Sequence, residues 1–390
     1  MLYEIETLGE INSFANKLQK LVNEPSLRAV IVLVAENNEW TAEVIDPLVK
    51  NRRIPVLGGI YPKLLMGKTV LERGALLLGV TVQPHIAIIP KLSAPQADFE
   101  DAIDYAIGSE YDCEETITDF SSYSRIGAFG QTTLVFFDGL SPGISPFVEG
   151  LFNVLGVEEN YIGGGAGSAS LEKMPCLITP EGLLQDAAML VGLNWHSGVG
   201  VAHGWERVAG SYIVTEAEGA IVKTINWRPA VDVYCEAIAA QSDKEITKEN
   251  LLEHTASYPL GLIRLGGDYI VRDPYKIIDD TIVFMGEVPS QSHVDLLHGK
   301  KNKLIEAAQA AQLIAKSSFP KEFDPTASFV LNCISRQRFL QDDFKEELAA
   351  VQLDKIPVFG ALTLGEIANT GGEHLELYNK ATVVGIVGTS

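Results

Sequence analysis

Near the C-terminus, residues 356–372 read IPVFGALTLGEIANTGG and place four glycines around a single carboxylate, Glu366. Glycine-rich loops that bind phosphate use a lysine, which this stretch lacks, and its carboxylate would repel an anionic phosphate. Two interpretations of Glu366 remain. Either it caps a tight turn between strands, or it lies at the rim of a pocket and accepts hydrogen bonds from a ligand ammonium or from an arginine.

Arg336 is the arginine that could meet Glu366. It follows the apolar run ASFVLNCI as Glu366 follows IPVFGAL, and in parallel sheets ligand crevices form at the carboxyl ends of strands. An arginine suits a carboxylate and a glutamate suits an ammonium. The pair therefore predicts a pocket for an amino-acid-like zwitterion, bordered by Gly360, Gly365 and Asn379. In an enzyme, Glu366 would instead act as general acid or base while Arg336 orients a small anionic substrate.

A second glycine-rich stretch, YIGGGAGSAS, contains Gly163, Gly164 and Gly165. The dinucleotide-binding fingerprint needs glycine or alanine where Ser168 stands, and no helical pattern follows at once. Two interpretations are left. The glycines allow a sharp turn at a strand end with close backbone approach, or their amides face a small ligand.

Histidine and cysteine give weaker signals. His196 and His203 stand seven residues apart, with no metal-ligand spacing and no HExxH motif, so no metal site is predicted. They are either satisfied or exposed histidines, or His203 or His196 is an axial haem ligand. Cys333 has apolar neighbours and is interpreted as a buried structural thiol rather than a nucleophile. No catalytic residue is assigned.

Charge and composition exclude several classes of protein. The 390 residues include 51 acidic and 30 basic side chains, for a formal net charge of −21. Nucleic acid and anionic lipid are polyanions and would repel such a chain. No apolar run approaches the ~18 residues of a membrane span, the acidic N-terminus is unlike a secretory signal, and the four cysteines form no CxxC pair. We expect a cytoplasmic protein that neither binds nucleic acid nor inserts into membranes.

A strand–helix–strand pattern recurs three times along the chain. The first strands cover residues 28–36, 132–139 and 327–334, and the glycine-containing runs cover 54–60, 161–167 and 356–362. Closing strands follow at 72–82, 186–195 and 380–388, and a leading strand and helix precede each unit, beginning at residues 1, 85 and 293. Strand–helix–strand order favours parallel pairing, which indicates an α/β fold with an internal repeat.

The material from about residue 196 to 292 differs from these units. Its short alternating strands are broken by Gly-Gly-Asp and Asp-Pro turns, and a helix follows Pro229. The predicted fold class is therefore mixed α/β: three degenerate strand–helix–strand–helix–turn–strand units with an inserted antiparallel β meander.

The chain resembles one family, that of proteins built from a FIST N domain followed by a FIST C domain. The resemblance is carried by HGWERVAGSYIVTEAEGAIV, RPAVDVY, YPLGLI, YIVRDP, VLNCISR, PVFGALTLGEIANTGG and YNKATVV. It implies a FIST N domain over residues 1–228 and a FIST C domain over residues 229–390. In IPVLGGIYPKLL the chain departs from the family, because Ile60 and Tyr61 stand where a glycine–cysteine–serine turn is typical.

The resemblance implies a cytosolic sensory protein of signal transduction that binds a small, amino-acid-like molecule without catalysis. Its output would pass to a separate partner such as a histidine kinase, a cyclic-di-GMP enzyme or a chemotaxis-type protein. Some relatives bind haem and sense nitric oxide, so a haem sensor is one alternative, although no cofactor is expected here. An enzyme that uses Glu366 and Arg336 is the other alternative.

Overall fold

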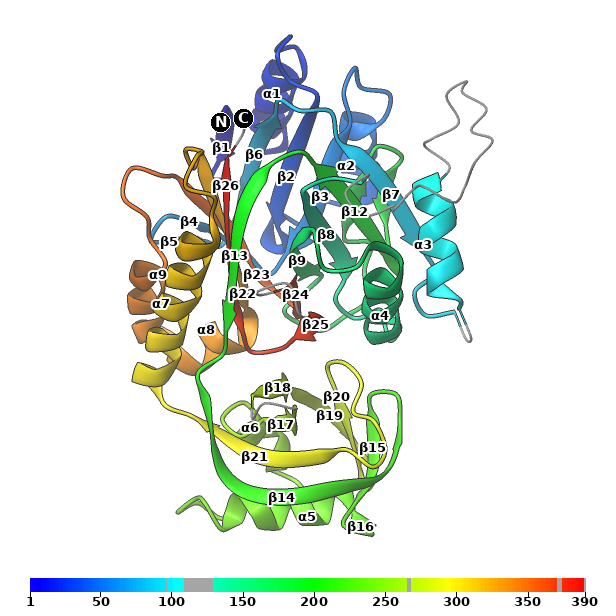
Figure 1. Cartoon of the computed structure of the whole chain (residues 1–390), viewed down its shortest axis with the longest axis vertical. Coiled ribbons are helices and arrows are strands. Elements are labelled where there is room, and N and C mark those ends of the chain that lie inside the picture. The colour runs from blue at the N-terminus through cyan, green and yellow to red at the C-terminus, as the bar shows by residue number, and fades with distance from the viewer. Residues whose placement is uncertain (95–96, 109–128, 265–267, 370–373, 389–390) are drawn as a thin grey trace.

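The computed structural model describes residues 1–94, 97–108, 129–264, 268–369 and 374–388. Within these residues the chain forms three six-stranded mixed sheets, helices that cover them, and one eight-stranded sheet set apart from the rest (Figure 1). The predicted α/β fold class with an inserted antiparallel sheet is confirmed. No helix in these residues is long and apolar enough to cross a membrane.

The first sheet shows the plan of all three. A central strand is parallel to the strand on one side and antiparallel to the strand on the other, and a hairpin completes the sheet. The strands are, in spatial order, β1 (Tyr3–Glu6), β6 (Ala75–Val80), β2 (Ala29–Ala35), β3 (Val56–Tyr61), β10 (Leu177–Thr179) and β11 (Gly182–Leu184).

The second and third sheets have the same order and the same directions of pairing. The second consists of β7 (His85–Pro90), β12 (Ala187–Leu193), β8 (Thr132–Asp138), β9 (Asn160–Ala166), β24 (Glu366–Asn369) and β25 (Leu375–Tyr378). The third consists of β13 (His196–Ala202), β26 (Thr382–Gly388), β22 (Ala327–Cys333), β23 (Val358–Thr363), β4 (Lys63–Met66) and β5 (Thr69–Leu71).

Each sheet takes its closing hairpin from another part of the chain. The hairpin β4–β5 leaves the N-terminal third of the chain and pairs with β23, β10–β11 pairs with β3, and β24–β25 pairs with β9. The three sheets are thus interlocked in a cycle. Their inner faces share one apolar core that includes Val32, Ile162, Phe329 and Val383.

The predicted glycine turns lie inside strands. Gly58, Gly163 and Gly360 each stand opposite a valine of the neighbouring parallel strand: Val32, Val135 and Val330. The sharp turn is therefore wrong, whereas the close backbone approach is present: a Cβ at Gly58 or Gly360 would collide with the backbone of the neighbouring strand. We interpret the shared register as the trace of an internal repeat.

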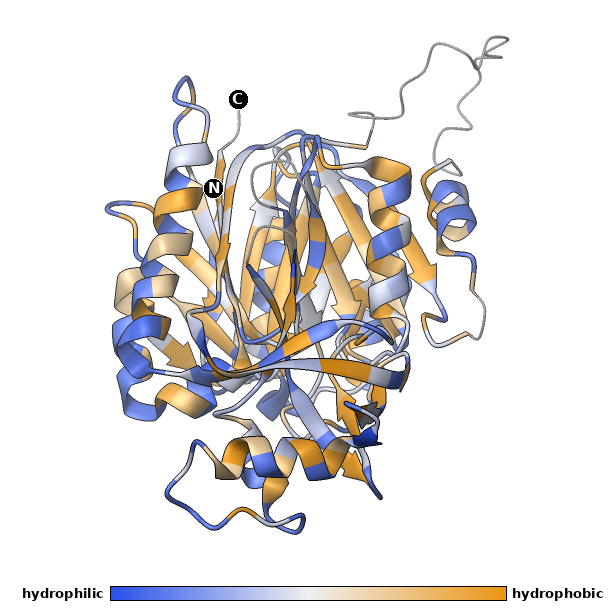
Figure 2. Cartoon of the chain, turned by 60° about the horizontal axis from the view of Figure 1, so that its bottom comes forward, coloured by the Kyte–Doolittle hydropathy of each residue, from blue (hydrophilic) through white to orange (hydrophobic). Residues whose placement is uncertain are grey.

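Helices cover the outer faces of the sheets. The first sheet carries α1 (Ile11–Val22) and α2 (Ala42–Val49), and the second carries α3 (Phe99–Gly108) and α4 (Ile144–Leu155). The third carries α7 (Lys301–Ser318), α8 (Ile334–Leu340) and α9 (Phe344–Ala350), and short 3-10 turns η1 (Glu36–Asn38) and η2 (Gln341–Asp343) complete the set. Apolar residues lie on one side of these helices, while the strands between them are largely apolar (Figure 2).

The eight-stranded sheet belongs to residues 205–299, which we name the inserted domain; the three interlocked sheets and their helices form the body. Its elements are β14 (Trp205–Glu218), β15 (Ile221–Ile225), β16 (Arg228–Pro229), α5 (Ala230–Ala239), α6 (Leu251–Thr255), β17 (Leu260–Ile263), β18 (Tyr269–Arg272), β19 (Pro274–Ile278), β20 (Thr281–Phe284) and β21 (His293–Gly299). It has its own apolar core, all of it between residues 208 and 296.

One expected strand occupies a different place. The strand that precedes α7 in sequence, β21, pairs with β14 and β17 of the inserted domain instead of leading the third unit. The edge of the third sheet is taken by β13, which pairs with β26. The insertion therefore separates the leading strand of the third unit from its helix, which sequence adjacency concealed.

Candidate functional site

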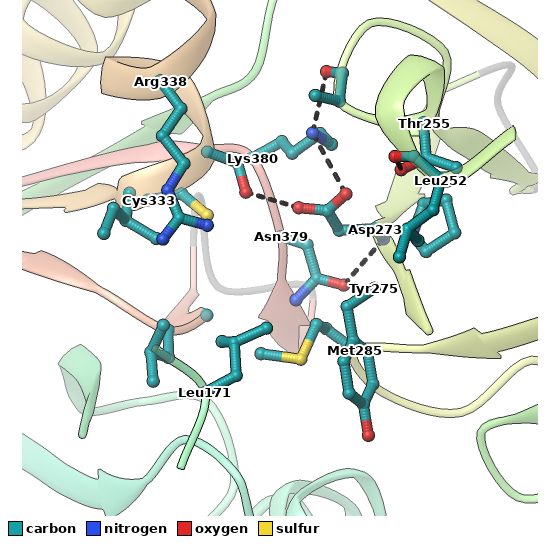
Figure 3. A pocket seen from close by; sticks show the side chains of 16 residues that line it. Leu171, Leu252, Thr255, Asp273, Tyr275, Met285, Cys333, Arg338, Asn379 and Lys380 are labelled. Atoms are coloured by element: carbon teal, nitrogen blue, oxygen red, sulfur yellow. Dashed lines mark hydrogen bonds and ion pairs between the residues drawn. The ribbon is translucent and has the colours of Figure 1, made fainter. Parts of the chain in front are cut away.

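A cavity of about 260 Å³ lies between the body and the inserted domain. It opens at the carboxyl ends of β22 and β23, marked by Cys333 and Leu364, which is where ligand crevices form beside parallel strands. Figure 3 shows the side chains that surround it. Its lining comes from the body through Leu171, Cys333, Ile334, Ser335, Arg338, Leu364, Gly365, Asn379 and Lys380, and from the inserted domain through Leu252, Thr255, Ala256, Asp273, Pro274, Tyr275 and Met285.

Lys380 provides a buried cation in the wall of this cavity. It lies in the turn between β25 and β26 with a left-handed backbone (φ +54°), and its side chain is fully buried. Its Nζ lies 3.0 Å from Asp273 Oδ1, donates to the carbonyl oxygen of Ala256 at 3.0 Å, and sits 4.9 Å from the ring centroid of Trp205. A carboxylate, a carbonyl and an aromatic face thus stabilise the ammonium.

Asp273 reaches the body from the inserted domain, where it joins β18 to β19. While Oδ1 faces Lys380, Oδ2 accepts a hydrogen bond of 2.5 Å from Ser335 Oγ. The backbone N–H of Asp273 points to Asn379 Oδ1 at 3.4 Å, as the dashed lines in Figure 3 show. Every one of these contacts joins the inserted domain to the body.

The rest of the lining consists of one further charged residue, Arg338, and of apolar side chains. Arg338 is exposed and donates through Nη2 to the carbonyl oxygen of Ala169 at 2.6 Å. Leu171, Met285 and Leu364 add apolar side chains to the lining. The cavity therefore offers two cationic groups, one carboxylate and hydrophobic surface within a small volume.

Glu366 lies beside the cavity but does not line it. It is fully buried at the start of β24, where it accepts hydrogen bonds from Thr363 Oγ1 at 2.6 Å and from the Ala381 backbone N–H at 3.4 Å. Burial raises the pKa of Glu366 well above its ordinary value, although these hydrogen bonds and the Arg336 charge oppose the shift. Burial also raises the pKa of the neighbouring Cys333 thiol, and the charges of Glu366 and Asp273 add to this effect.

Arg336 is satisfied entirely by the protein. Its Nε and one Nη2 hydrogen bind the carboxylate of Glu347 at 2.8 and 3.1 Å. The other three N–H groups donate to the backbone carbonyls of His203, Lys380 and Leu304. A guanidinium has five N–H donors, so none is left for a ligand. Arg336 does not line the cavity, and we assign it a structural role in place of the ligand contact expected from the sequence.

The predicted glycine contacts fall into two groups. Gly365 lines the cavity beside Asn379. Gly163, Gly164 and Gly165 lie in β9, and Gly360 lies in β23. All four pair with residues of neighbouring strands, so their backbones are part of the sheets. None of these four glycines lines the cavity.

The two histidines lie far apart. His196 begins β13 and stacks on Phe323 with ring centroids 3.4 Å apart, whereas His203 follows the end of the strand. A strand rises ~3.3 Å per residue, which places them ~23 Å apart. His203 Nδ1 accepts a hydrogen bond from the Trp205 backbone N–H at 3.0 Å. Neither residue lines the cavity, so this arrangement does not fit an axial haem ligand there, and the described residues contain no cluster suited to a metal ion.

The polar residues of the cavity that sequence reasoning missed include Asp273, Ser335, Arg338 and Lys380. Asp273 and Lys380 are separated by more than a hundred residues, and nothing in local spacing connects them. A signal was nevertheless present, since Asp273 lies in YIVRDP and Lys380 lies in YNKATVV, where charged residues stand beside apolar strand residues.

Comparison with known families gives two matches. The sequence model of the FIST N domain matches residues 15–228, and that of the FIST C domain matches residues 230–369. No curated protein matches the chain. The two matched ranges share sheets, because β4 pairs with β23 and β9 pairs with β24.

Proposed function

Since this chain belongs to the FIST family, whose domains are sensor domains of signal transduction, we propose that it senses a small amino-acid-like molecule in the cavity between the body and the inserted domain. The sequence domains would be residues 1–228 and 229–390. The output would pass to a separate cytoplasmic partner of the histidine kinase, cyclic-di-GMP or chemotaxis type.

The observation that carries this proposal is the pairing of opposite charges in one small cavity. A ligand ammonium would pair with Asp273, and a ligand carboxylate would pair with Lys380 and the nearby Arg338. Buried charges are stable only when paired, so the site favours a ligand that carries both signs. A volume of about 260 Å³ suits a molecule of few heavy atoms.

Calorimetry with a panel of L-amino acids tests this proposal, guided by mass spectrometry of any small molecule that co-purifies. Lys380→Met keeps the length of the side chain but removes the ammonium, and we expect at least ~10-fold weaker binding, about 1.4 kcal/mol. Lys300→Met is the matched control, because Lys300 makes an exposed ion pair with Glu206. It should bind as the wild type does.

Glu366→Gln is a second control, since Glu366 does not line the cavity. We expect its affinity for the same amino acid to stay within ~2-fold of the wild type, as no ligand contact is lost. Thermal melts separate loss of binding from loss of fold. If no L-amino acid binds, or if binding is unchanged in Lys380→Met, the proposal is wrong.

A further inference from the structure

The carboxylate of Asp273 occupies an anion site that the body provides. Lys380 Nζ and Ser335 Oγ, both of the body, lie 3.0 and 2.5 Å from its two oxygens. Ser335 lies in the first turn of α8, and Lys380 stands in the turn before β26, so independent elements converge on one carboxylate. The carboxylate itself comes from a different unit, the inserted domain.

This site requires an anion. Lys380 is fully buried, and its other partners, the Ala256 carbonyl and the Trp205 ring, are neutral. A buried ammonium without a counterion is strongly destabilising. The geometry already accepts a carboxylate with one oxygen toward the ammonium and the other toward the hydroxyl.

Building on the proposed function, we infer that Asp273 is an internal competitor, and that a ligand carboxylate replaces it at Lys380 and Ser335. The displaced Asp273 then pairs with the ligand ammonium. A zwitterion thus converts one ion pair into two and leaves no charge unpaired. A simple carboxylate would leave Asp273 without a partner in a largely buried place, so the wild type discriminates against it.

Displacement of Asp273 moves the inserted domain, because this residue is fixed between two of its strands. The domain has its own core and joins the body through β14 and β21, which lie side by side at Trp205 and Gly299 (Figure 1). Val271 and Leu297 pack against the core of the third sheet, close to this connection. Exchange of the carboxylate therefore links ligand binding to the position of the whole inserted domain.

The inserted domain is also attached to the body by contacts that lie outside the anion site. Arg264 pairs with Glu376, and Arg272 Nη1 donates to the carbonyl oxygen of Leu377 at 3.0 Å. These contacts lie around a second cavity that shares no lining residue with the first. They provide a control, since Glu376→Gln weakens the attachment of the domain without touching Lys380 or Ser335.

Propionate, which carries a carboxylate but no amine, tests the inference by calorimetry. Asp273→Asn removes the internal competitor, and we expect it to bind propionate at least ~10-fold more tightly than the wild type, about 1.4 kcal/mol. The double variant Asp273→Asn/Lys380→Met should lose this binding, and Glu376→Gln should show none of the gain. Equal or weaker binding to Asp273→Asn overturns the inference, as does an equal gain in Glu376→Gln.

Hydrogen exchange on the unmodified chain provides a second measurement that does not depend on the folding of a variant. High propionate should speed exchange of the Asp273 amide, which points to Asn379 in the unliganded state. Unchanged or slower exchange counts against displacement. If amino acids bind through Lys380 but Asp273→Asn gains nothing for propionate, this inference fails and the proposed function stands. If neither amino acids nor propionate bind, both fail.

Discussion

Two buried cations, Arg336 beside the cavity and Lys380 in its wall, lie next to each other and differ in what satisfies them. Arg336 donates all five of its N–H groups to residues of the body, two of them to Glu347. Within the residues that the structure describes, the close counterion of Lys380 is Asp273 of the inserted domain. The first cation therefore fixes the body, whereas the second depends on a contact that can be exchanged.

The structural role of Arg336 predicts a large loss of stability on its removal. Arg336→Met leaves the buried Glu347 carboxylate without its cation and removes the guanidinium bonds to three backbone carbonyls, and we expect a cost of about 3–5 kcal/mol in the free energy of unfolding. Urea unfolding measures this change. Arg228→Met is the control, because Arg228 pairs with Glu236 at an exposed position and should give no resolvable change. A small loss for Arg336→Met would contradict the structural assignment.

His203 predicts a dependence of stability on pH. Burial, helped by the Arg336 charge, lowers the pKa of His203 to about 4 from an ordinary value of 6.5. Between these values the unfolded chain binds a proton that the folded chain excludes, so stability is lost as the pH falls from 6.5 toward 4. The contribution is about 3 kcal/mol at most.

His203→Asn should reduce this loss while retaining an acceptor for the Trp205 N–H. Denaturant unfolding between pH 7 and 4 gives the comparison, with the difference between variant and wild type isolating this histidine from the other groups that titrate there. If the free energy of unfolding falls equally with pH in the two proteins, His203 binds its proton as readily in the folded chain as in the unfolded chain.

At this scale the sequence predicts part of the site. The sequence predicts Gly365 and Asn379 at the pocket, and both line the cavity, because both stand in loops that follow recognisable strands. It predicts Arg336 and Glu366 as the charged residues of the pocket, whereas Asp273, Arg338 and Lys380 line the cavity. Whether Arg336 or Lys380 faces a cavity depends on which carbonyls and carboxylates lie nearby, and these come from His203, Leu304 and Asp273 through contacts that only the folded chain creates.

At the scale of elements, apolar runs are reliable guides and glycines are not. The buried strands β2, β8 and β22 lie where continuous apolar stretches predicted them, since strands covered on both faces carry no polar alternation. Glycine suggests a turn when only its backbone freedom is considered. Here the close approach of neighbouring strands requires it, a tertiary requirement without a local signature.

Gly360 shows how tight this approach is. A Cβ there would stand 1.9 Å from the carbonyl oxygen of Val330, and at Gly58 it would stand 1.8 Å from that of Val32. Gly360→Ala and Gly58→Ala should each lower the free energy of unfolding by about 1–3 kcal/mol or more, because backbone would have to move. Gly108→Ala, with open space around its Cβ, is the control. Thermal melts should show both strand variants destabilised; tolerance of either would mean that the strands can separate locally at little cost.

At the scale of the whole molecule, the exchange of hairpins makes the two sequence domains depend on each other. The range 1–228 contains β4–β5 but lacks their partner β23, and its second sheet lacks β24 and β25. An uncovered β9 edge presents unpaired backbone groups. The boundary between the two family matches therefore does not separate two independent sets of sheets.

A fragment of residues 1–228 should therefore not fold independently. We expect aggregation, or a circular dichroism melt without a cooperative transition, and recovery of a soluble complex when residues 229–390 are co-expressed with it. The NMR spectrum of the backbone amides of the isolated fragment tests this expectation. Well-dispersed signals and a cooperative melt for residues 1–228 alone would show that the borrowed hairpins are dispensable.

The cyclic exchange of hairpins also sets the time at which this protein can be completed on the ribosome. The hairpin that ends at Leu71 waits for the strand that begins at Val358, a gap of 358 − 71 = 287 residues. At about 5–20 residues per second, the early hairpin remains without its partner for about 15–60 s. Its open edge is exposed to other nascent chains throughout that interval. Synthesis of this protein should accordingly depend on chaperones that act on the growing chain, with the third sheet closing only as the last strands emerge.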